Sequence, residues 1–198
     1  MKTEWEMSDA QFQEAVASAI ARRDGEALGE AVGSYATFCE KDVQFWEAFP
    51  DGTFQFVTDL LAKDHEVEFD GIWHLFLLFR YEWSRLSASQ RETLLPLLGK
   101  AYQKPMGDMT RFVICELLGE FYSNSDALDL LKQFGKMESE QSRLFVPHAL
   151  EHLIEETVNP TIRAAALDYL TTLQSDTSER VREEANAAAK ATGNRIAE

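Results

Sequence analysis

Apolar residues recur at helical spacing along most of the chain. The stretch from Met109 to Tyr122 carries them at positions i, i+3, i+4 and i+7, and the stretch that Ser139 opens repeats the pattern. The residues expected to form the buried stripe of the second stretch are Val146, Ala149, Leu150 and Leu153. One face of an α-helix has this period, so the pattern predicts a succession of amphipathic helices.

Several of these stretches begin with a recognisable helix start. Ser8–Gln11 and Ser87–Gln90 have the spacing of a capping box, in which a serine and a glutamine satisfy each other's backbone N–H groups. Asn159-Pro160 combines a capping residue with a proline at the first helical position. A second helix is expected from about Glu26 to Glu40, and Pro96 is expected to break or kink the helix that Ser87 opens.

Aromatic residues are densest between Phe45 and Trp83. Within this zone Phe49–Gly52 has the composition of a turn, and Phe54–Lys63 predicts a short helix. The segment Asp70–Leu86 is apolar on nearly every side, which predicts one helix buried on two faces. The aromatic run leaves a strand open as the alternative for this last segment.

A short sequence motif recurs about once per helix in the second half of the chain. It consists of a capping residue followed by an arginine three or four positions later, then by apolar residues at helical spacing. Its occurrences are Asp108–Arg111, Ser139–Arg143, Asn159–Arg163 and Ser178–Arg182. A sequence motif that repeats in this way indicates a stack of helical hairpins.

Three segments resemble the first helices of HEAT-like repeats, a family of α-solenoids built from paired antiparallel helices. They are Gly107–Phe121, Ser178–Ala185 and Asn159–Ala166. The resemblance implies a right-handed solenoid in which an arginine ties one hairpin to the next through an acidic side chain. Arg163 departs from the pattern, because it lies on what should be the second helix of its pair, and this leaves the repeat register open.

We therefore predict an all-α protein of stacked, HEAT-like hairpins. Residues 1–198 are expected to form a single domain, with an irregular helical part over 1–69 and the repeats over 70–198. An irregular helical bundle would satisfy the same apolar stripes and remains the alternative architecture.

The charge balance restricts the choice of partner. The 34 acidic residues outnumber the 19 basic ones, for a net charge of −15, and phosphate binding depends on Lys and Arg displacing counterions. We therefore expect no nucleic acid partner and favour a basic protein. The sequence also carries no secretory signal, no membrane span and no cysteine pairing, so a cytoplasmic protein is expected.

Acidic and aromatic residues are interleaved between Glu40 and Asp70. Interfaces favour aromatic anchors, and complementary charge steers a basic partner toward them. The residues predicted to bind the partner are Trp46, Phe49, Asp51, Asp59, Asp64, Glu66 and Glu68. Among the aromatic residues, Trp46 and Phe49 are expected to be exposed. The function predicted is a non-enzymatic interaction module, such as an acidic inhibitor or immunity-type protein that neutralises a basic protein.

One motif supports an alternative function. His148, Glu151 and His152 match the H-x-x-E-H order of inverzincin metalloproteases, and histidines four positions apart on one helical face can share a zinc ion. An ordinary polar helix face has the same appearance, so the sequence predicts neither a metal nor a cofactor here. A metal-dependent hydrolase and a HEAT-like nucleic-acid-processing enzyme remain the alternative functions.

Overall fold

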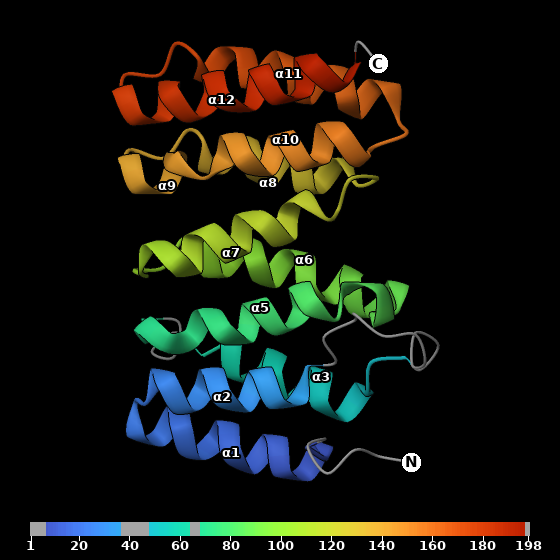
Figure 1. Cartoon of the computed structure of the whole chain (residues 1–198), viewed down its shortest axis with the longest axis vertical. Helices are drawn as coiled ribbons and strands as arrows, with labels where there is room; N and C mark the ends of the chain where they lie inside the picture. Colours follow the sequence, from blue (N-terminus) through green and yellow to red (C-terminus); the bar gives the residue numbers. More distant parts are fainter. Residues whose placement is uncertain (1–6, 37–47, 64–67, 197–198) are drawn as a thin grey trace. The chain divides into compact units, whose positions relative to one another are not determined.

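The computed structural model describes residues 7–36, 48–63 and 68–196, with side chains as far as Gly193. Within these ranges every regular element is an α-helix or a short 3₁₀ turn, and no strand occurs (Figure 1). The predicted all-α class is therefore confirmed. The chain divides into two compact units, residues 1–110 and 111–198.

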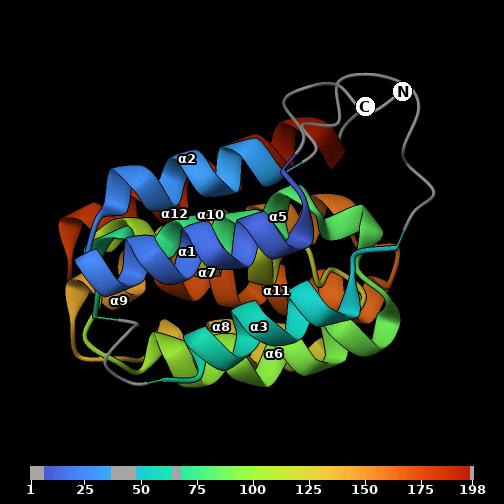
Figure 2. The ribbon, with the colours of Figure 1, turned by 90° about the horizontal axis from the view of Figure 1, so that it is seen from below.

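The first unit contains five α-helices and two 3₁₀ turns among its described residues. The elements are α1 Asp9–Arg22, α2 Gly25–Tyr35, α3 Asp51–Leu61, η1 Asp70–Ile72, α5 Trp73–Tyr81, η2 Trp83–Arg85 and α6 Ala88–Tyr102. Helix α1 packs along α2, and α3 lies beside α6 (Figure 2).

The helix starts of this unit follow from local hydrogen bonding. Both predicted capping boxes form, at the start of α1 and at the start of α6. Helix α1 ends where Arg23 adopts a left-handed conformation with φ of 54°, and its N–H caps the carbonyl groups of Ala19 and Ile20. Pro96 lies inside α6 without ending it, so the break expected there does not occur.

The predicted long helix over Asp70–Leu86 is interrupted in the structure. The chain leaves the helical path at Glu82, whose side chain is fully buried and accepts a hydrogen bond from Arg85 at 2.5 Å. The carbonyl group of Glu82 also accepts the N–H groups of Arg85 and Leu86. A buried carboxylate needs such partners, and the turn that supplies them replaces the last part of the expected helix.

An aromatic cluster joins the helices of the first unit. The rings of Phe12 and Tyr35 stack at 4.2 Å between centroids, which connects α1 to α2. Phe79 of α5 packs against Phe54 at 5.4 Å and against Phe49 at 6.3 Å. These buried rings thus form part of the core of the first unit.

Among its described residues, the second unit contains only helices and the connections between them. The helices are α7 Asp108–Gly119, whose first three residues belong to the first unit, α8 Ser125–Phe134, α9 Glu140–Leu144, α10 Val146–Glu156, α11 Pro160–Leu173 and α12 Glu179–Ile196. Helix α8 packs against α11, while α10 packs against both α11 and α12 (Figure 1). The helix expected after Ser139 is divided at Phe145 into α9 and α10.

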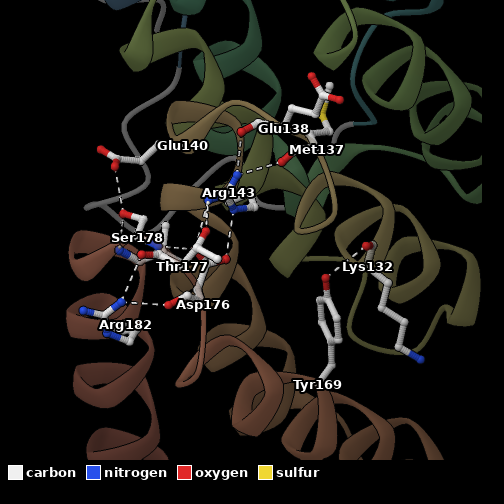
Figure 3. Close-up of polar contacts among 11 residues, drawn as sticks. Lys132, Met137, Glu138, Glu140, Arg143, Tyr169, Asp176, Thr177, Ser178 and Arg182 are labelled. Atoms are coloured by element: carbon white, nitrogen blue, oxygen red, sulfur yellow. Dashed lines mark hydrogen bonds and ion pairs between the residues drawn. The ribbon is translucent and has the colours of Figure 1, made fainter.

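The recurring arginines of the second unit bond to the connections that precede their helices. Arg143 donates to the carbonyl groups of Met137 and Glu138 at 2.8 and 2.7 Å (Figure 3). Arg182 donates likewise to Asp176 and Thr177, at 2.8 and 3.1 Å.

Arg163 acts in the same way, because it donates to the carbonyl groups of Ile154 and Thr157. These oxygens lie where helix ends leave carbonyl groups without intrahelical partners. The arginine of this sequence motif therefore stabilises the connection before its helix. This explains why Arg163 is present whether its helix is the first or the second of a hairpin.

Candidate functional site

The histidines of the H-x-x-E-H motif lie on a side of α10 that α7 partly covers, and not on the fully outward face that the sequence predicts. The opposite side is buried as predicted, through Val146, Ala149, Leu150 and Leu153. The side chains of His148 and His152 are 36% and 35% exposed, so both rings remain accessible from solvent. Their centroids are 4.8 Å apart, which is expected for residues one helical turn apart.

A third side chain joins the two histidines from a different helix. Glu116 of α7 places Oε1 2.6 Å from Nε2 of His148 and 3.5 Å from Nε2 of His152. The potential ligand atoms of these three residues all lie within 4.8 Å of one another. We call this group, Glu116, His148 and His152, the His₂Glu cluster.

The close approach of α7 and α10 depends on a glycine. A Cβ atom at Gly119 would lie 2.9 Å from Cβ of His152 and 3.3 Å from the carbonyl oxygen of Ala149. Contacts this short are rare between real Cβ atoms, so a larger residue would push the end of α7 away. Gly119 therefore holds α7 close to α10, three residues beyond Glu116.

Electrostatics favour a hydrogen bond between His148 and Glu116. This hydrogen bond raises the pKa of His148 above its usual value, against the opposing effect of burial. The side chain of Glu116 is only 15% exposed, which strengthens its interaction with a protonated imidazole. The ring of His148 also stacks on Phe112, with centroids 5.8 Å apart and planes 14° from parallel.

The glutamate of the motif, Glu151, occupies a different position from Glu116. Its Oε2 atom lies 3.8 Å from Nδ1 of His148, whereas Nε2 of that ring is the atom that faces Glu116. Nδ1 and Nε2 are on different edges of the imidazole ring, so the two carboxylates flank one histidine. Glu151 is thereby placed to orient the ring of His148.

The sequence identified two members of the cluster and missed the third. Glu116 belongs to α7 and is surrounded along the chain by the buried residues Val113, Ile114, Cys115, Leu117 and Leu118. A single carboxylate within such an apolar run is the signal that could have found it, because a partly buried carboxylate needs a partner. The identity of that partner depends on helix packing, which periodicity does not reveal.

The predicted partner-binding residues divide into three groups. Trp46, Asp64 and Glu66 lie outside the described residues, whereas Asp51, Asp59 and Glu68 are exposed as a binding role requires. The expected exposure of Phe49 is wrong, since the residue is 2% exposed.

Packing explains the burial of Phe49. Its ring contacts Tyr35 and Phe79, and its carbonyl oxygen accepts a hydrogen bond from Gln90 at 3.0 Å. Gln90 also donates to Asp51 at 3.0 Å, which anchors the start of α3. Phe49 thus belongs to the aromatic core.

Comparisons with known proteins add no family to this description. No protein-family model, no curated protein and no solved structure matches the chain. None of the described helices combines the length and the apolar composition that crossing a bilayer requires. Function must therefore be argued from the residues themselves.

Proposed function

We propose that this chain is a non-enzymatic protein-interaction module of the HEAT-like, α-solenoid kind, and that it binds a basic protein. The arrangement of the second unit supports the solenoid. Its hairpins stack with α8 against α11 and with α10 against α12, so helices at equivalent places in consecutive hairpins pack on each other. This order is typical of α-solenoids, whereas an irregular bundle does not require it.

The observation that carries the proposal is the ion pair between Arg143 and Asp176. Nε and Nη2 of Arg143 donate to the two carboxylate oxygens of Asp176, both at 2.9 Å (Figure 3). The two residues are 33 positions apart, and they join α9 to the connection between α11 and α12. An arginine that ties one hairpin to the next through an acidic residue is what the HEAT-like resemblance implies.

The chemistry of the partner follows from charge. The net charge of −15 favours a basic surface, and Asp59 and Glu68 are exposed within the acidic stretch Glu40–Asp70. The same charge disfavours nucleic acid, which a protein binds mainly through Lys and Arg. In its most specific form, the proposal is that the chain acts in the cytoplasm as an inhibitor or immunity-type protein for a basic protein.

The alternative function as a metal-dependent hydrolase receives less support. Such a mechanism needs a glutamate that reaches the water bound to the metal. Glu151, the candidate in the motif, lies at the Nδ1 edge of His148 rather than beside Nε2. We therefore assign Glu151 a positioning role and propose no catalytic residue.

The proposal is tested by capturing partners from the organism's own cell lysate on the immobilised chain. We expect a basic protein that elutes as salt is raised, because screening weakens attraction between charged surfaces. The variant Asp59→Lys/Glu68→Lys should bind the purified partner at least tenfold more weakly. Its matched control is Glu14→Lys/Glu30→Lys, which reverses two exposed carboxylates on α1 and α2 and should bind nearly as well as the wild type.

Two results would contradict the proposal. One is capture that does not respond to salt, and the other is equal loss of binding in both charge-reversed variants. The pair Asp59 and Glu68 is preferred to Asp51 because Asp51 accepts a hydrogen bond from Gln90, so that its reversal would also disturb the start of α3.

A further inference from the structure

We propose that Glu116, His148 and His152 form a binding site for one divalent transition-metal ion of the zinc class. Two imidazole nitrogens and one carboxylate oxygen are a donor set that zinc, cobalt(II) and nickel(II) accept. The site goes beyond the proposed binding of a protein partner, and it uses a glutamate that the H-x-x-E-H motif does not contain.

The two distances from Glu116 to the histidine nitrogens are close to those that a tetrahedral ion requires. Ligands about 2.0–2.1 Å from zinc at tetrahedral angles are about 3.3 Å from each other. Nε2 of His152 and Oε1 of Glu116 are 3.5 Å apart, so this edge already has the required length. The edge from His148 to Glu116 is 2.6 Å and must lengthen by less than 1 Å, a change that side-chain rotation supplies.

The cluster is more than a pair of exposed histidines. Glu116 is largely buried on a separate helix, and Gly119 allows that helix to approach the backbone of α10. Phe112 stacks on one face of His148, while Glu151 lies beside its Nδ1 atom as an outer partner of the kind that orients metal-bound histidines. These contacts hold the donors in place before any ion binds, which lowers the entropy lost on binding.

Metal binding at this site would tie α7 to α10. The three protein ligands leave one coordination position, which water can fill because both histidines are about one-third exposed. An ion that binds the folded chain and not the unfolded chain stabilises the fold. Ion binding should therefore stabilise the second unit, in which both helices contribute ligands.

The test is a titration of the untagged, chelator-treated chain with Co²⁺, followed by visible absorption. We expect one Co²⁺ per chain, the strong visible bands of a four-coordinate site, and displacement of cobalt by Zn²⁺. Glu116→Gln and His152→Gln should each weaken binding at least tenfold. Glu184→Gln is the matched control, an exposed glutamate on α12 whose replacement should leave the affinity unchanged.

Thermal unfolding with and without Zn²⁺ gives a second measurement. We expect Zn²⁺ to raise the midpoint of the wild type and to leave the midpoint of Glu116→Gln unchanged. If Glu116→Gln loses its helical circular dichroism, Glu116→Ala replaces it in both measurements, and His152→Gln remains the second site variant because its side chain, about one-third exposed, is replaced by one of similar length.

Three results would overturn the proposal. The first is the absence of stoichiometric Co²⁺ binding by the wild type. The second is affinity that both site variants retain in full. The third is loss of binding in His152→Gln with no loss in a folded Glu116→Gln variant, which would indicate chelation by a surface histidine pair only.

Discussion

Among the described residues, the core of the first unit contains a larger share of aromatic side chains than the core of the second. In the first unit Phe12, Phe49, Phe54 and Phe79 are buried, and their ring contacts with one another and with Tyr35 connect the four helices α1, α2, α3 and α5. The core of the second unit is mainly aliphatic, with leucine, isoleucine, valine and alanine at most of its buried positions. Ring contacts therefore join several helices of the first unit, whereas aliphatic side chains fill most of the core of the second.

The connections between helices are stabilised by the same kind of contact in both units. In the second unit Arg143, Arg163 and Arg182 each donate to a carbonyl group of the preceding connection. In the first unit Arg91 of α6 donates to the carbonyl group of Trp83, and Gln90 of the same helix donates to Phe49 and Asp51. An arginine in the first turn or two of a helix therefore stabilises the preceding connection in both units.

The largest effect should come from removing the central ring of the first unit. Phe79→Ala should cost about 4 kcal/mol, because the residue is fully buried and contacts two other rings. Hydrogen exchange followed by mass spectrometry should show faster exchange in α1, α3 and α5, with protection retained in α12. Phe79→Leu, which keeps most of the volume, should cost less than half as much. Equal loss of protection in the two units would contradict the comparison.

Breaking the ion pair of the second unit should have the next largest effect. Arg143→Ala should cost about 3 kcal/mol, because Arg143 and Asp176 are only 10% and 8% exposed and the carboxylate would lose its bonded partner. Hydrogen exchange should then accelerate in α9 and in the connection before α12. Arg143→Lys should recover little, since lysine cannot donate two parallel hydrogen bonds.

A matched control exists for this ion pair. Arg180 pairs with Glu140 at 3.0 Å but is 60% exposed, so Arg180→Ala should cost less than 1 kcal/mol. Similar costs for Arg143→Ala and Arg180→Ala would remove the structural importance that we give to the Arg143–Asp176 pair.

A smaller effect is expected at the contact between α8 and α11. A Cβ atom at Gly135 would collide with the hydroxyl oxygen of Tyr169, so Gly135→Ala should cost about 2 kcal/mol. Tyr169→Phe should cost about 1 kcal/mol, because it removes the hydrogen bond to the carbonyl group of Lys132. The double variant should be more stable than the sum of the two costs implies, and chemical denaturation measures this coupling. If the costs of the two single substitutions simply add in the double variant, the contact between Gly135 and Tyr169 would not be supported.

The smallest effect should be a loss of folding stability at acidic pH. Burial alone would raise the pKa of Asp176, but hydrogen bonds from Arg143 and from the backbone of Ser178 lower it overall. A carboxyl group whose pKa is lower in the folded state contributes stability above its unfolded pKa, and this is lost as pH falls through the folded value. We therefore expect the second unit to lose stability below about pH 4, the usual pKa of an aspartate.

Asp176→Asn gives the control for this pH dependence. The variant should be less stable at neutral pH, and its stability should fall less steeply as acid is added, because the asparagine cannot titrate. Urea denaturation at a series of pH values makes the comparison. Parallel curves for the wild type and the variant would show that Asp176 is not a source of the acid sensitivity.

The helix starts could be predicted because they depend on neighbouring residues. The capping boxes at Ser8 and Ser87 and the capping residue Asn159 act over three positions of the chain. Helix ends were predicted less well, since the interruption at Glu82 depends on a buried carboxylate and its hydrogen bond from Arg85.

The candidate sites show the same limit. Two histidines four positions apart on an amphipathic helix were visible in the sequence, but their neighbour Glu116 is contributed by another helix. Phe49 was expected to be exposed because a turn sequence follows it, yet packing against Tyr35 and Phe79 buries its ring.

Local patterns in the amino-acid sequence are enough to predict the all-α class, most helix starts, the buried stripe of α10 and the positions of the arginines near the starts of the later helices. The tertiary structure decided which residues those arginines meet, where the aromatic side chains are buried, and which carboxylate joins His148 and His152. The two groups of features differ because the interactions behind them act over different separations along the chain. Capping and helical periodicity act within one or two turns, whereas ion pairs between helices and burial in a core depend on segments far apart in the chain.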